Sequence, residues 1–546
     1  MYKTTAKLQY FFVTTKFFCT FAAVMLKNIL FLLIYIGVSL SSLANETRAV
    51  WLTTIGGIDW PHSYSSLAQK EELTQILDDL AAAGINTILL QTRIRATTIF
   101  PSSMEPFDGC LTGHSGKGPD YDALQFAIEE CHCRGMKLHA WIVTIPIGKW
   151  KGEGCRKLRS RYPKMVKKIG DEGFLNPEAS GTADYIADFC KEVTEKYDID
   201  GIHLDYIRYP DSWGKIRNRS EARNNITRIV KAVYREVKAL KPWVQLSCSP
   251  VGKYSDTKRQ SSVGWNARDV VCQDVALWMQ EGLMDAIYPM MYFRNQHFYP
   301  FVIDWKERSN GRIVAPGLGV YMLHRSERNW PLTDITREMY VLRQYGMGIT
   351  MFRSKFLTDD TKGIYQFTKD FNALPALQPA MTWYDVTPPV APEKVKYSDG
   401  ILSWEDVGGD VTYNVYCSET TPVDTQNPEN LVMADYHDTS IKLPPLKTAQ
   451  YFAVTATDRY GNESPRPVSK ASKASGKPVR PQNINTLLAD VPSSQMILVC
   501  TIHGNALFLG YKYNLPTLSP GHYKVYLQGK KIKNRHLLGW GEVPLK

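Results

Sequence analysis

Residues 200–210 combine a short apolar run with acidic, basic and aromatic side chains. If this run is a strand, its side chains alternate between two faces. Ile202 and Leu204 then share one face, and His203 and Asp205 share the other. Buried polar groups are costly unless they have partners. A polar face on a buried strand is therefore expected to line a site, with Asp205 placed to act as a carboxylate.

Several other expected strands end in side chains that suit the binding of a sugar. Aromatic rings can stack on pyranose faces, while Arg, Asn and Gln side chains bond to hydroxyl groups. Plain packing in a large core is the alternative for the aromatic residues. The expected substrate-binding residues are Gln91, Arg93, His139, Trp141, His203, Tyr206, Arg208, Tyr292 and Tyr321.

Two histidines raise the alternative of a metal site. His139 and His203 could bind a metal ion together with Asp205, although a histidine in a barrel more often bonds to neighbours or to a sugar. The Cys-His-Cys run at 131–133 falls inside an expected helix, where positions two apart do not face each other. No second pair follows at zinc spacing. We therefore expect no metal and no other cofactor.

Short apolar runs and amphipathic segments alternate from residue 47 to about residue 371. Eight strand-helix pairs predict an α/β fold, a (β/α)8 TIM barrel whose site lies at the carboxyl ends of its strands. A doubly wound sheet is the alternative. The expected strands are 48–53, 86–92, 136–143, 200–210, 244–249, 284–292, 312–319 and 349–352. The expected helices are 66–83, 121–134, 179–197, 220–240, 267–281, 299–308, 333–345 and 361–371.

The pattern changes to short alternating strands after a Pro-rich linker at 387–392. This part resembles a fibronectin type III β-sandwich, with Trp404 on the second strand and Tyr451 as the corner tyrosine. A second linker at 470–479 leads to a small C-terminal β module, either a sorting module or a structural cap. The predicted division is 1–44 (signal region), 45–380 (barrel), 387–469 (fibronectin type III-like) and 480–546 (C-terminal module).

The amino-terminal region has the pattern of a signal peptide. Lys27 precedes an apolar run at 28–38 and small residues at 42–44, and Met25 is a plausible start. The apolar run is short for a membrane span, and an uncleaved signal anchor is the alternative. Ten cysteines without regular spacing, of which Cys19 falls in this region, do not indicate a disulfide framework. A secreted, periplasmic or cell-envelope protein with no membrane span after cleavage is expected.

The charge of the chain does not favour nucleic acid as a partner. The formal net charge is +11, and four lysines with no acidic residue lie in 1–44. The remaining basic residues are spread out, apart from a cluster at 149–168, whereas nucleic-acid binding needs a concentrated patch. This cluster is expected to be a solvated face or a contact with an anionic envelope polymer.

Several segments resemble the bacterial glycosyl hydrolase-like 10 family. They are Arg-Ala-Val-Trp at 48–51, Gln-Thr-Arg at 91–93, 119–124, 134–141, 200–205 with Tyr-Pro at 209–210, and Tyr-Pro at 288–289 with Tyr292. The resemblance implies a barrel glycosidase that acts outside the cytoplasm, in some relatives on peptidoglycan glycan strands. The chain departs from the pattern at Tyr206, where many relatives have Asp, and at 142–144, where Asn-Pro is common.

Glycoside hydrolysis normally uses two carboxyl groups. We expect Asp205 to be the nucleophile or base, as its position resembles that of the nucleophile in amylase-like barrels, with His203 and Arg93 holding it ionised. The structural alternative is a buried Asp205 that merely pairs with Arg93 or Arg208.

The acid is marked less plainly. Asp256 is favoured by its position after the fifth expected strand, and Asp59 and Glu105 are alternatives.

The predicted function is a glycoside hydrolase that cleaves O-glycosidic bonds of a polysaccharide or of peptidoglycan glycan by acid/base chemistry. One alternative is a carbohydrate-binding barrel without catalysis, consistent with Tyr206 and the weakly marked acid. A second is a metal-dependent polysaccharide deacetylase or a lyase. The expected partner is a glycan.

Overall fold

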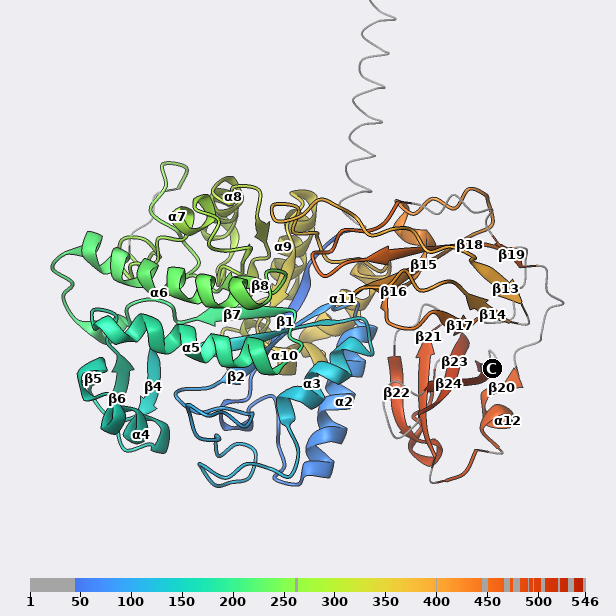
Figure 1. The fold of residues 1–546 in the computed structure, drawn as a ribbon, viewed down its shortest axis with the longest axis horizontal. Coiled ribbons are helices and arrows are strands. Elements are labelled where there is room, and N and C mark those ends of the chain that lie inside the picture. Colours follow the sequence, from blue (N-terminus) through green and yellow to red (C-terminus); the bar gives the residue numbers. More distant parts are fainter. Residues whose placement is uncertain are drawn as a thin grey trace, which may run out of the picture.

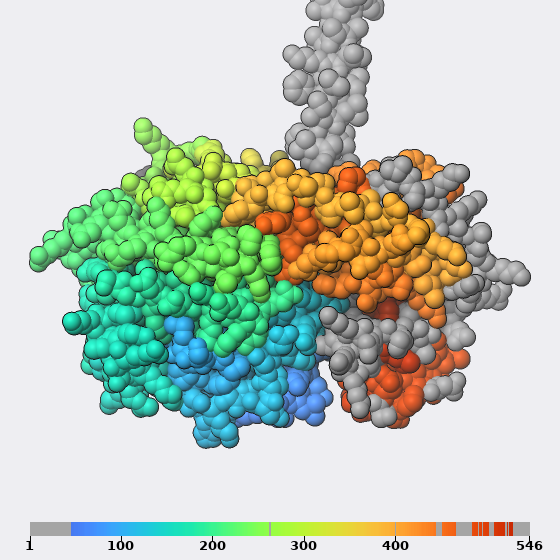
Figure 2. Space-filling model, viewed as in Figure 1, coloured from blue at the N-terminus to red at the C-terminus, as the bar shows by residue number. Residues whose placement is uncertain are grey.

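The computed structural model describes residues 45–260, 264–398, 400–443, 450–465, 472–474, 482–489, 491–493, 495–501, 506–518, 521–528 and 535–543. The predicted signal peptide lies outside these residues. A parallel sheet surrounded by helices forms the larger lobe, and two β modules form a second lobe beside it (Figures 1 and 2). None of the helices in the described ranges is both long and apolar enough to cross a membrane.

All eight predicted strands are present in the parallel sheet. They are β1 (Arg48–Leu52), β2 (Thr87–Arg93), β3 (Lys137–Val143), β7 (Gly201–Asp205), β8 (Gln245–Cys248), β9 (Ala286–Ile287), the pair β10 (Ile313–Val314) and β11 (Gly317–Leu318), and β12 (Ile349–Met351). Each strand lies beside the next strand of the barrel, and β1 also pairs with β12.

The seventh strand closes the sheet in two pieces. Its first piece, β10, pairs with β9, and its second piece, β11, pairs with β12. Pro316 lies between them and has no N–H to give to the ladder. Its carbonyl still accepts a hydrogen bond from the Thr350 amide at 3.0 Å. One strand thus contacts both neighbours, so the predicted TIM barrel is confirmed and a doubly wound sheet is excluded.

Helices cover the outside of the barrel (Figure 1). They are α2 (Ser66–Ala82), α3 (Ala123–His132), α5 (Ser180–Lys196), α6 (Arg219–Leu240), α7 (Val275–Gln280), α8 (Tyr299–Glu307), α9 (Leu332–Gln344), α10 (Ser354–Thr358) and α11 (Ile364–Phe371). In α6, Ile226, Val230, Val233 and Val237 recur at helical spacing and are buried.

The fifth outer helix is shorter than predicted. Helix α7 starts at Val275, whereas the sequence pattern predicted a helix from 267. The Ala267 and Arg268 amides instead donate to the carbonyls of Lys253 and Tyr254 at 2.8 and 2.9 Å. The segment before α7 therefore pairs with the loop after β8 and does not begin the helix.

The interior of the barrel is a packed core, as is usual for this fold. Trp51 lies near its centre, with ring centroids 5.9 Å from His203 and 6.3 Å from Tyr288. The buried hydrophobic residues of this interior are Ala49, Trp51, Leu89, Trp141, Val143, Ala286, Tyr288, Ile313 and Ala315. Substrate can therefore reach only an end of the barrel.

An arm of residues 146–175 follows the third barrel strand and contains the predicted basic cluster. It consists of β4 (Pro146–Lys149), α4 (Glu153–Arg161), β5 (Val166–Ile169) and β6 (Glu172–Leu175), whose strands form a separate antiparallel sheet. Because it leaves the carboxyl end of β3, this basic arm lies at the site end of the barrel, at the left of Figure 1.

The first β module is a sandwich of two antiparallel sheets. One sheet has β13 (Lys396–Ser398), β14 (Ile401–Ser403) and β17 (Ser440–Lys442); the other has β16 (Leu431–Tyr436), β15 (Thr412–Ser418), β18 (Gln450–Thr457) and β19 (Ser472–Ala474). Strand β19 falls in a stretch that the sequence predicted to be a linker. The composition of this stretch is rich in Ser and Lys and shows no apolar alternation, so nothing in the sequence marked a strand there. The fibronectin type III likeness and the predicted domain bounds stay predictions.

The second β module is a five-stranded sheet. It contains β20 (Gln482–Asn483), β21 (Met496–Thr501), β22 (Ala506–Tyr511), β23 (Gly521–Gln528) and β24 (Arg535–Val543), with the short helix α12 (Ile484–Leu488). Strand β22 packs against α2 of the barrel. A small C-terminal β module, as predicted, is therefore present.

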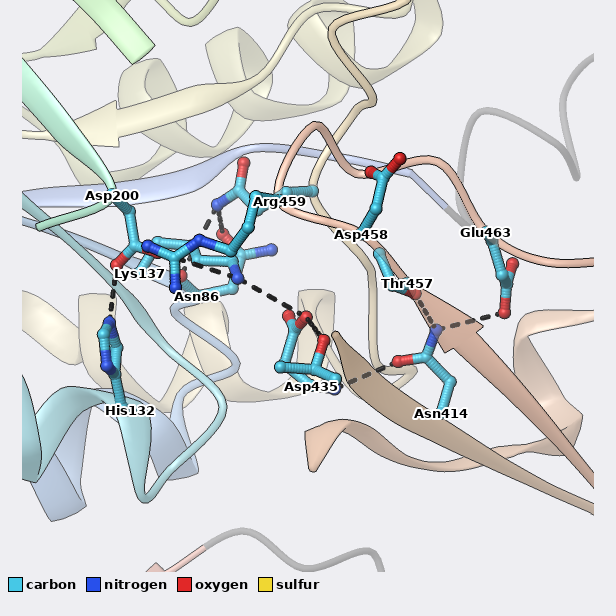
Figure 3. Close-up of polar contacts among 12 residues, drawn as sticks. Asn86, His132, Lys137, Asp200, Asn414, Asp435, Thr457, Asp458, Arg459 and Glu463 are labelled. Carbon is cyan, nitrogen blue, oxygen red and sulfur yellow. Dashed lines mark hydrogen bonds and ion pairs between the residues drawn. The ribbon is translucent and has the colours of Figure 1, made fainter. Parts of the chain in front are cut away.

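Charged side chains join the sandwich to the amino ends of the barrel strands (Figure 3). Lys137 Nζ lies 3.7 Å from Asp200 Oδ1 and 3.5 Å from Asp435 Oδ1 of the sandwich. His132 Nε2 lies 2.8 Å from Asp200 Oδ2, and Arg459 Nη2 lies 2.6 Å from an oxygen of Asp198. His132, the histidine of the Cys-His-Cys run, thus contributes to the polar contacts of this interface.

Candidate active site at the carboxyl end of the barrel

Asp205 is the last residue of β7 and is held by three hydrogen-bond donors. Its Oδ2 accepts from Trp141 Nε1 at 3.1 Å, and its Oδ1 accepts from Ser249 Oγ and from the Tyr206 amide, both at 2.8 Å. Burial raises the pKa of Asp205, against the opposing effects of the Ser249 hydrogen bond and the Arg208 charge. The carboxylate therefore has a fixed orientation and holds a proton more readily than an exposed Asp.

His203 lies two residues below Asp205, within the barrel core. Its Nε2 accepts from Trp51 Nε1 at 3.2 Å, and its Nδ1 is 3.0 Å from Ser247 Oγ. Burial holds the pKa of His203 well below its usual value, so the ring is neutral. With Nε2 accepting, Nδ1 carries the proton and donates to Ser247. Both ring nitrogens thus form hydrogen bonds with side chains of the barrel core.

Arg93 lies outside the barrel mouth, contrary to the expected pairing with Asp205. The register of β2 against β3 shifts between Gln91 and Arg93. The guanidinium instead binds Glu105, with Nη2 2.7 Å from Oε1, and also donates to the Thr144 carbonyl at 2.8 Å. Asp205 is therefore held by Ser249, Trp141 and Tyr206, and Arg93 stabilises the loop that contains Glu105.

Gln91 supports the loop after β1. Its Oε1 accepts from the amides of Thr54 and Ile55 at 3.0 and 2.8 Å. Its side-chain oxygen is therefore committed to the backbone of this loop.

His139 lies at the opposite end of the barrel from Asp205. Its ring packs on Gly201, at the start of β7, so closely that an added Cβ there would lie 2.6 Å from the ring. Burial lowers the pKa of His139 to about 4. The ring borders a cavity of about 50 Å³ at the interface with the sandwich. Ligand pockets are usually ~300 Å³ or larger, so this cavity suits a few waters and not a sugar.

Aromatic residues surround Asp205 at the mouth. The ring centroid of Tyr292 is 5.7 Å from that of Tyr321 and 5.4 Å from that of Phe352. Burial, the neighbouring Tyr321 and the charge of Asp205 raise the pKa of Tyr292 well above its usual value. Tyr206, Tyr292 and Tyr321 are half-buried.

Arg208 also lies at the mouth, between two rings. Its guanidinium carbon is 4.4 Å from the ring centroid of Tyr206 and 4.9 Å from that of Trp265. The side chain is 3 % exposed. Of the predicted substrate-binding residues, the structure thus brings Trp141, Tyr206, Arg208, Tyr292 and Tyr321 together near Asp205.

The three candidates for the second carboxyl have different surroundings. The side chain of Asp256 is 58 % exposed and lies 3.7 Å from Lys253 Nζ. Glu105 is bound by Arg93 and accepts from Tyr185 Oη at 2.7 Å.

Asp59 is buried after β1. Its Oδ2 accepts from the Thr53 amide at 3.0 Å and its carboxylate pairs with Arg353, and burial raises its pKa against the charge of Arg353. A general acid requires a raised pKa at working pH. The direction of the shift at Asp59 agrees with such a role, whereas the side chain of Asp256 is 58 % exposed.

Two residues at the mouth were not predicted. Ser249 could have been found, because Ser247 and Ser249 are two apart on an expected buried strand, the same polar alternation that marked His203 and Asp205. Trp265 comes from the loop after β8, where no periodic pattern marks it. Across the described ranges, no group of three or more His, Cys, Asp or Glu side chains is arranged to hold a metal ion.

Comparison with known proteins agrees with this geometry. The glycosyl hydrolase-like 10 family matches residues 46–223 and 215–317, which include β1 to β10 of the barrel and Asp205. The chain belongs to the glycosyl hydrolase-like 10 family. The predicted resemblance is therefore confirmed.

Curated relatives of this glycosyl hydrolase-like 10 protein are also named glycosyl hydrolases. Glycosyl hydrolase YngK of Bacillus subtilis (strain 168) is 29 % identical over 486 residues, covering 79 % of this chain and 93 % of that protein. Glycosyl hydrolase DigH of Escherichia coli (strain K12) is 29 % identical over 301 residues, covering 47 % of this chain and 69 % of that protein. The family and these relatives place the chain among the glycoside hydrolases.

Among solved structures, the PgaB (BpsB) glycoside hydrolase domain from Bordetella bronchiseptica has a TM-score of 0.43 and 11 % sequence identity to this chain. The match covers 61 % of this chain and 100 % of that domain.

Proposed function

We propose that this protein hydrolyses O-glycosidic bonds of a polysaccharide or of peptidoglycan glycan, with Asp205 as nucleophile or base. The observation that carries the proposal is the placement of Asp205. It ends the fourth strand of the barrel in a glycosyl hydrolase-like 10 protein, and Trp141, Ser249 and the Tyr206 amide hold its carboxylate. Active sites of TIM barrels lie at this end of the strands.

The surroundings of Asp205 suit each part of the reaction. Three donors fix the carboxylate, so a sugar bound above it meets the oxygens in one orientation. The half-buried rings of Tyr206, Tyr292 and Tyr321 offer faces for pyranose stacking. Asp59 and Asp256 are the candidates for the acid that protonates the leaving oxygen. Asp59 is favoured because burial raises its pKa.

We also propose that the protein acts outside the cytoplasm. The support is the signal-peptide pattern around residues 28–44, together with the basic arm, which suits an anionic envelope polymer. The fibronectin type III-like sandwich is proposed to be an accessory module of the barrel.

A second candidate function is carbohydrate binding without catalysis. The exposed carboxylate of Asp256 and the pairing of Asp59 with Arg353 favour it. In this case the aromatic rings and Arg208 would still bind a glycan, but no acid would assist the departure of the leaving group.

One pair of variants separates the two functions. Asp205→Asn removes the carboxylate charge, while Asp188→Asn changes an exposed carboxylate on α5 and serves as the control. Both variants and the native protein are incubated with polysaccharides and with peptide-free peptidoglycan strands, and new reducing ends are measured. Loss of release in Asp205→Asn alone supports hydrolysis. Equal turnover in both variants refutes the mechanism, and binding without release in the native protein supports the second candidate.

A further inference from the structure

Tyr206 has a backbone conformation that is rare for its side chain. Its φ angle is +51°, in the left-handed region. A bulky side chain is an outlier there, because its Cβ crowds the backbone, whereas Gly, Asn and Asp tolerate this region. Strain of this kind persists only where the surroundings enforce it, and it is concentrated at functional sites. Here it occurs directly after Asp205, the last residue of β7.

The left-handed turn reverses the alternation of side chains along the strand. Ile202 and Leu204 belong to the core between the barrel and its helices, and residue 206 would follow them on that face. The ring of Tyr206 instead packs against the hydrophobic interior of the barrel, and Ile207 takes the outer place with 0 % exposure. Two successive side chains, those of Asp205 and Tyr206, therefore lie at the mouth.

The turn also directs a main-chain donor to the carboxylate of Asp205. In an extended strand this N–H would point sideways to a neighbouring strand. The Tyr206 amide instead donates to Asp205 Oδ1 at 2.8 Å. The carbonyl of the same peptide plane accepts from the Thr144 amide and hydroxyl at 2.9 and 2.8 Å. Both ends of this plane are therefore held by hydrogen bonds.

The chain after Tyr206 is also held in place. The Tyr206 carbonyl accepts from the Arg208 amide at 2.8 Å, and the Arg208 guanidinium carbon is 4.4 Å from the Tyr206 ring centroid. The side chain of Ile207 is fully buried. With both flanks fixed, a residue that requires negative φ would have to rotate the peptide plane or move Ile207 out of the core. Rotation of the plane would take the N–H away from Asp205.

We propose that Tyr206 is a positioning residue, whose left-handed backbone keeps its amide N–H on Asp205 Oδ1 and so fixes the carboxylate for the reaction. This inference rests on the proposed function, because it concerns the orientation of the proposed nucleophile or base. The backbone conformation carries this role, and the tyrosine ring does not. A contact between the ring and a ligand would be a separate contribution.

The groups around Asp205 allow its titration to be followed. Within the described part of the chain, the charged or titratable groups that act on or near this carboxylate include Arg208, Cys248 and Tyr292. Arg208 keeps its charge at all working pH values. Burial raises the pKa of Cys248 and that of Tyr292 well above their usual values. These three groups therefore do not titrate between acid and neutral pH.

The test compares Tyr206→Asn with Tyr206→Val in the full chain. Both variants lose the ring and have side chains of similar size, but Asn tolerates a left-handed φ and β-branched Val does not. The pH profile of kcat/KM is measured on released reducing ends. Tyr206→Val should move the acidic limb upward by about one pH unit, the effect of losing one hydrogen bond to a charged group. Tyr206→Asn should leave the limb in place, while KM changes alike in both.

Two controls separate this effect from a general loss of stability. Tyr206→Gly should leave the acidic limb in place, and Tyr206→Ala should move it part of the way. Asn310→Val introduces the same conflict at an exposed residue with φ +50°, between α8 and β10. This control should lower the melting temperature without moving the limb. Circular dichroism checks folding, and the Gly and Ala pair serves if Tyr206→Val does not fold.

A second measurement needs no substrate. The melting temperature of Tyr206→Val should lie below that of Tyr206→Asn, and this difference should be larger at neutral pH than in acid. The lost hydrogen bond favours the ionised carboxylate, so its absence raises the folded pKa of Asp205 and costs stability as pH rises through it. In the Asp205→Asn background the difference should not depend on pH.

Equal movement of the acidic limb in Tyr206→Asn and Tyr206→Val overturns the inference and assigns the effect to the ring. An unmoved limb in Tyr206→Val overturns it as well, and so does a melting difference that is independent of pH with native Asp205. If the native protein releases no reducing ends but the melting difference depends on pH as expected, the proposed function is refuted. The positioning of Asp205 by Tyr206 then still stands.

Discussion

Ser249→Ala should change the pH dependence of the reaction without blocking it. Ser249 Oγ donates to Asp205 Oδ1 at 2.8 Å, and both side chains are buried. This hydrogen bond favours the ionised carboxylate, and it is the first of the effects that oppose the rise in pKa caused by burial. Its removal should therefore raise the pKa of Asp205 further.

The size of the change follows from the partners that remain. A hydrogen bond to a charged group contributes ~1.5–3 kcal/mol. The lower end applies here, because Trp141 and the Tyr206 amide still donate to the carboxylate. Since ~1.4 kcal/mol corresponds to one pH unit, the acidic limb of kcat/KM should move upward by about one pH unit. Activity well above that limb should change little.

The assay is a kcat/KM profile on the released reducing ends, with Ser247→Ala as the matched control. Ser247 lies on the same face of β8, two residues earlier, but contacts His203 and not Asp205. Its substitution should leave the acidic limb in place. An unmoved limb in Ser249→Ala, or equal movement in both variants, would show that Asp205 is not the group that titrates.

Three further predictions concern stability. Asp205→Asn should raise the free energy of unfolding at neutral pH, because the folded pKa of Asp205 is raised and the native protein loses stability as pH rises through it. The gain should vanish in acid, and an equal gain at all pH values in thermal melts would argue against this origin. Arg93→Met should cost about 3–5 kcal/mol in urea unfolding, because it leaves the buried Glu105 without its cation, whereas a loss below about 1 kcal/mol would contradict the burial of the pair. Asp200→Asn should lower stability at neutral pH by about 3 kcal/mol. Burial opposes ionisation of Asp200, but the charges of His132 and Lys137 hold its pKa below the usual range, so its contribution is present above the unfolded pKa and lost as pH falls. The difference between native and variant melting temperatures should therefore decrease in acid. A difference that increases in acid would refute the stabilising role of the ionised Asp200.

The barrel could be predicted from the sequence because its evidence is local and repeated. Each strand appears as a short apolar run and most helices as an amphipathic segment, so eight repeats identified the fold. The position of Asp205 followed from alternation along 200–205. Helix α7 was predicted too long because the hydrogen bonds from Ala267 and Arg268 go to a loop, which a helical pattern does not reveal.

The site was less predictable, because the depth of a side chain in the barrel and the direction in which it points depend on contacts between strands. Arg93 was expected at the mouth, but a register shift after Gln91 turns it toward Glu105. His139 lies on the same strand face as Trp141, yet only Trp141 reaches Asp205, because His139 lies beside Gly201 at the other end. The stacking of Arg208 on Trp265 joins two loops, and no sequence spacing marks such a contact.

The ion pairs of Lys137, Asp200 and Asp435 also determine which way the barrel mouth faces. They hold the sandwich against the amino ends of the strands, whereas Asp205 and the basic arm lie at the carboxyl ends. Any surface to which the C-terminal modules attach is then behind the barrel. The mouth would then face away from that surface and stay accessible to a glycan.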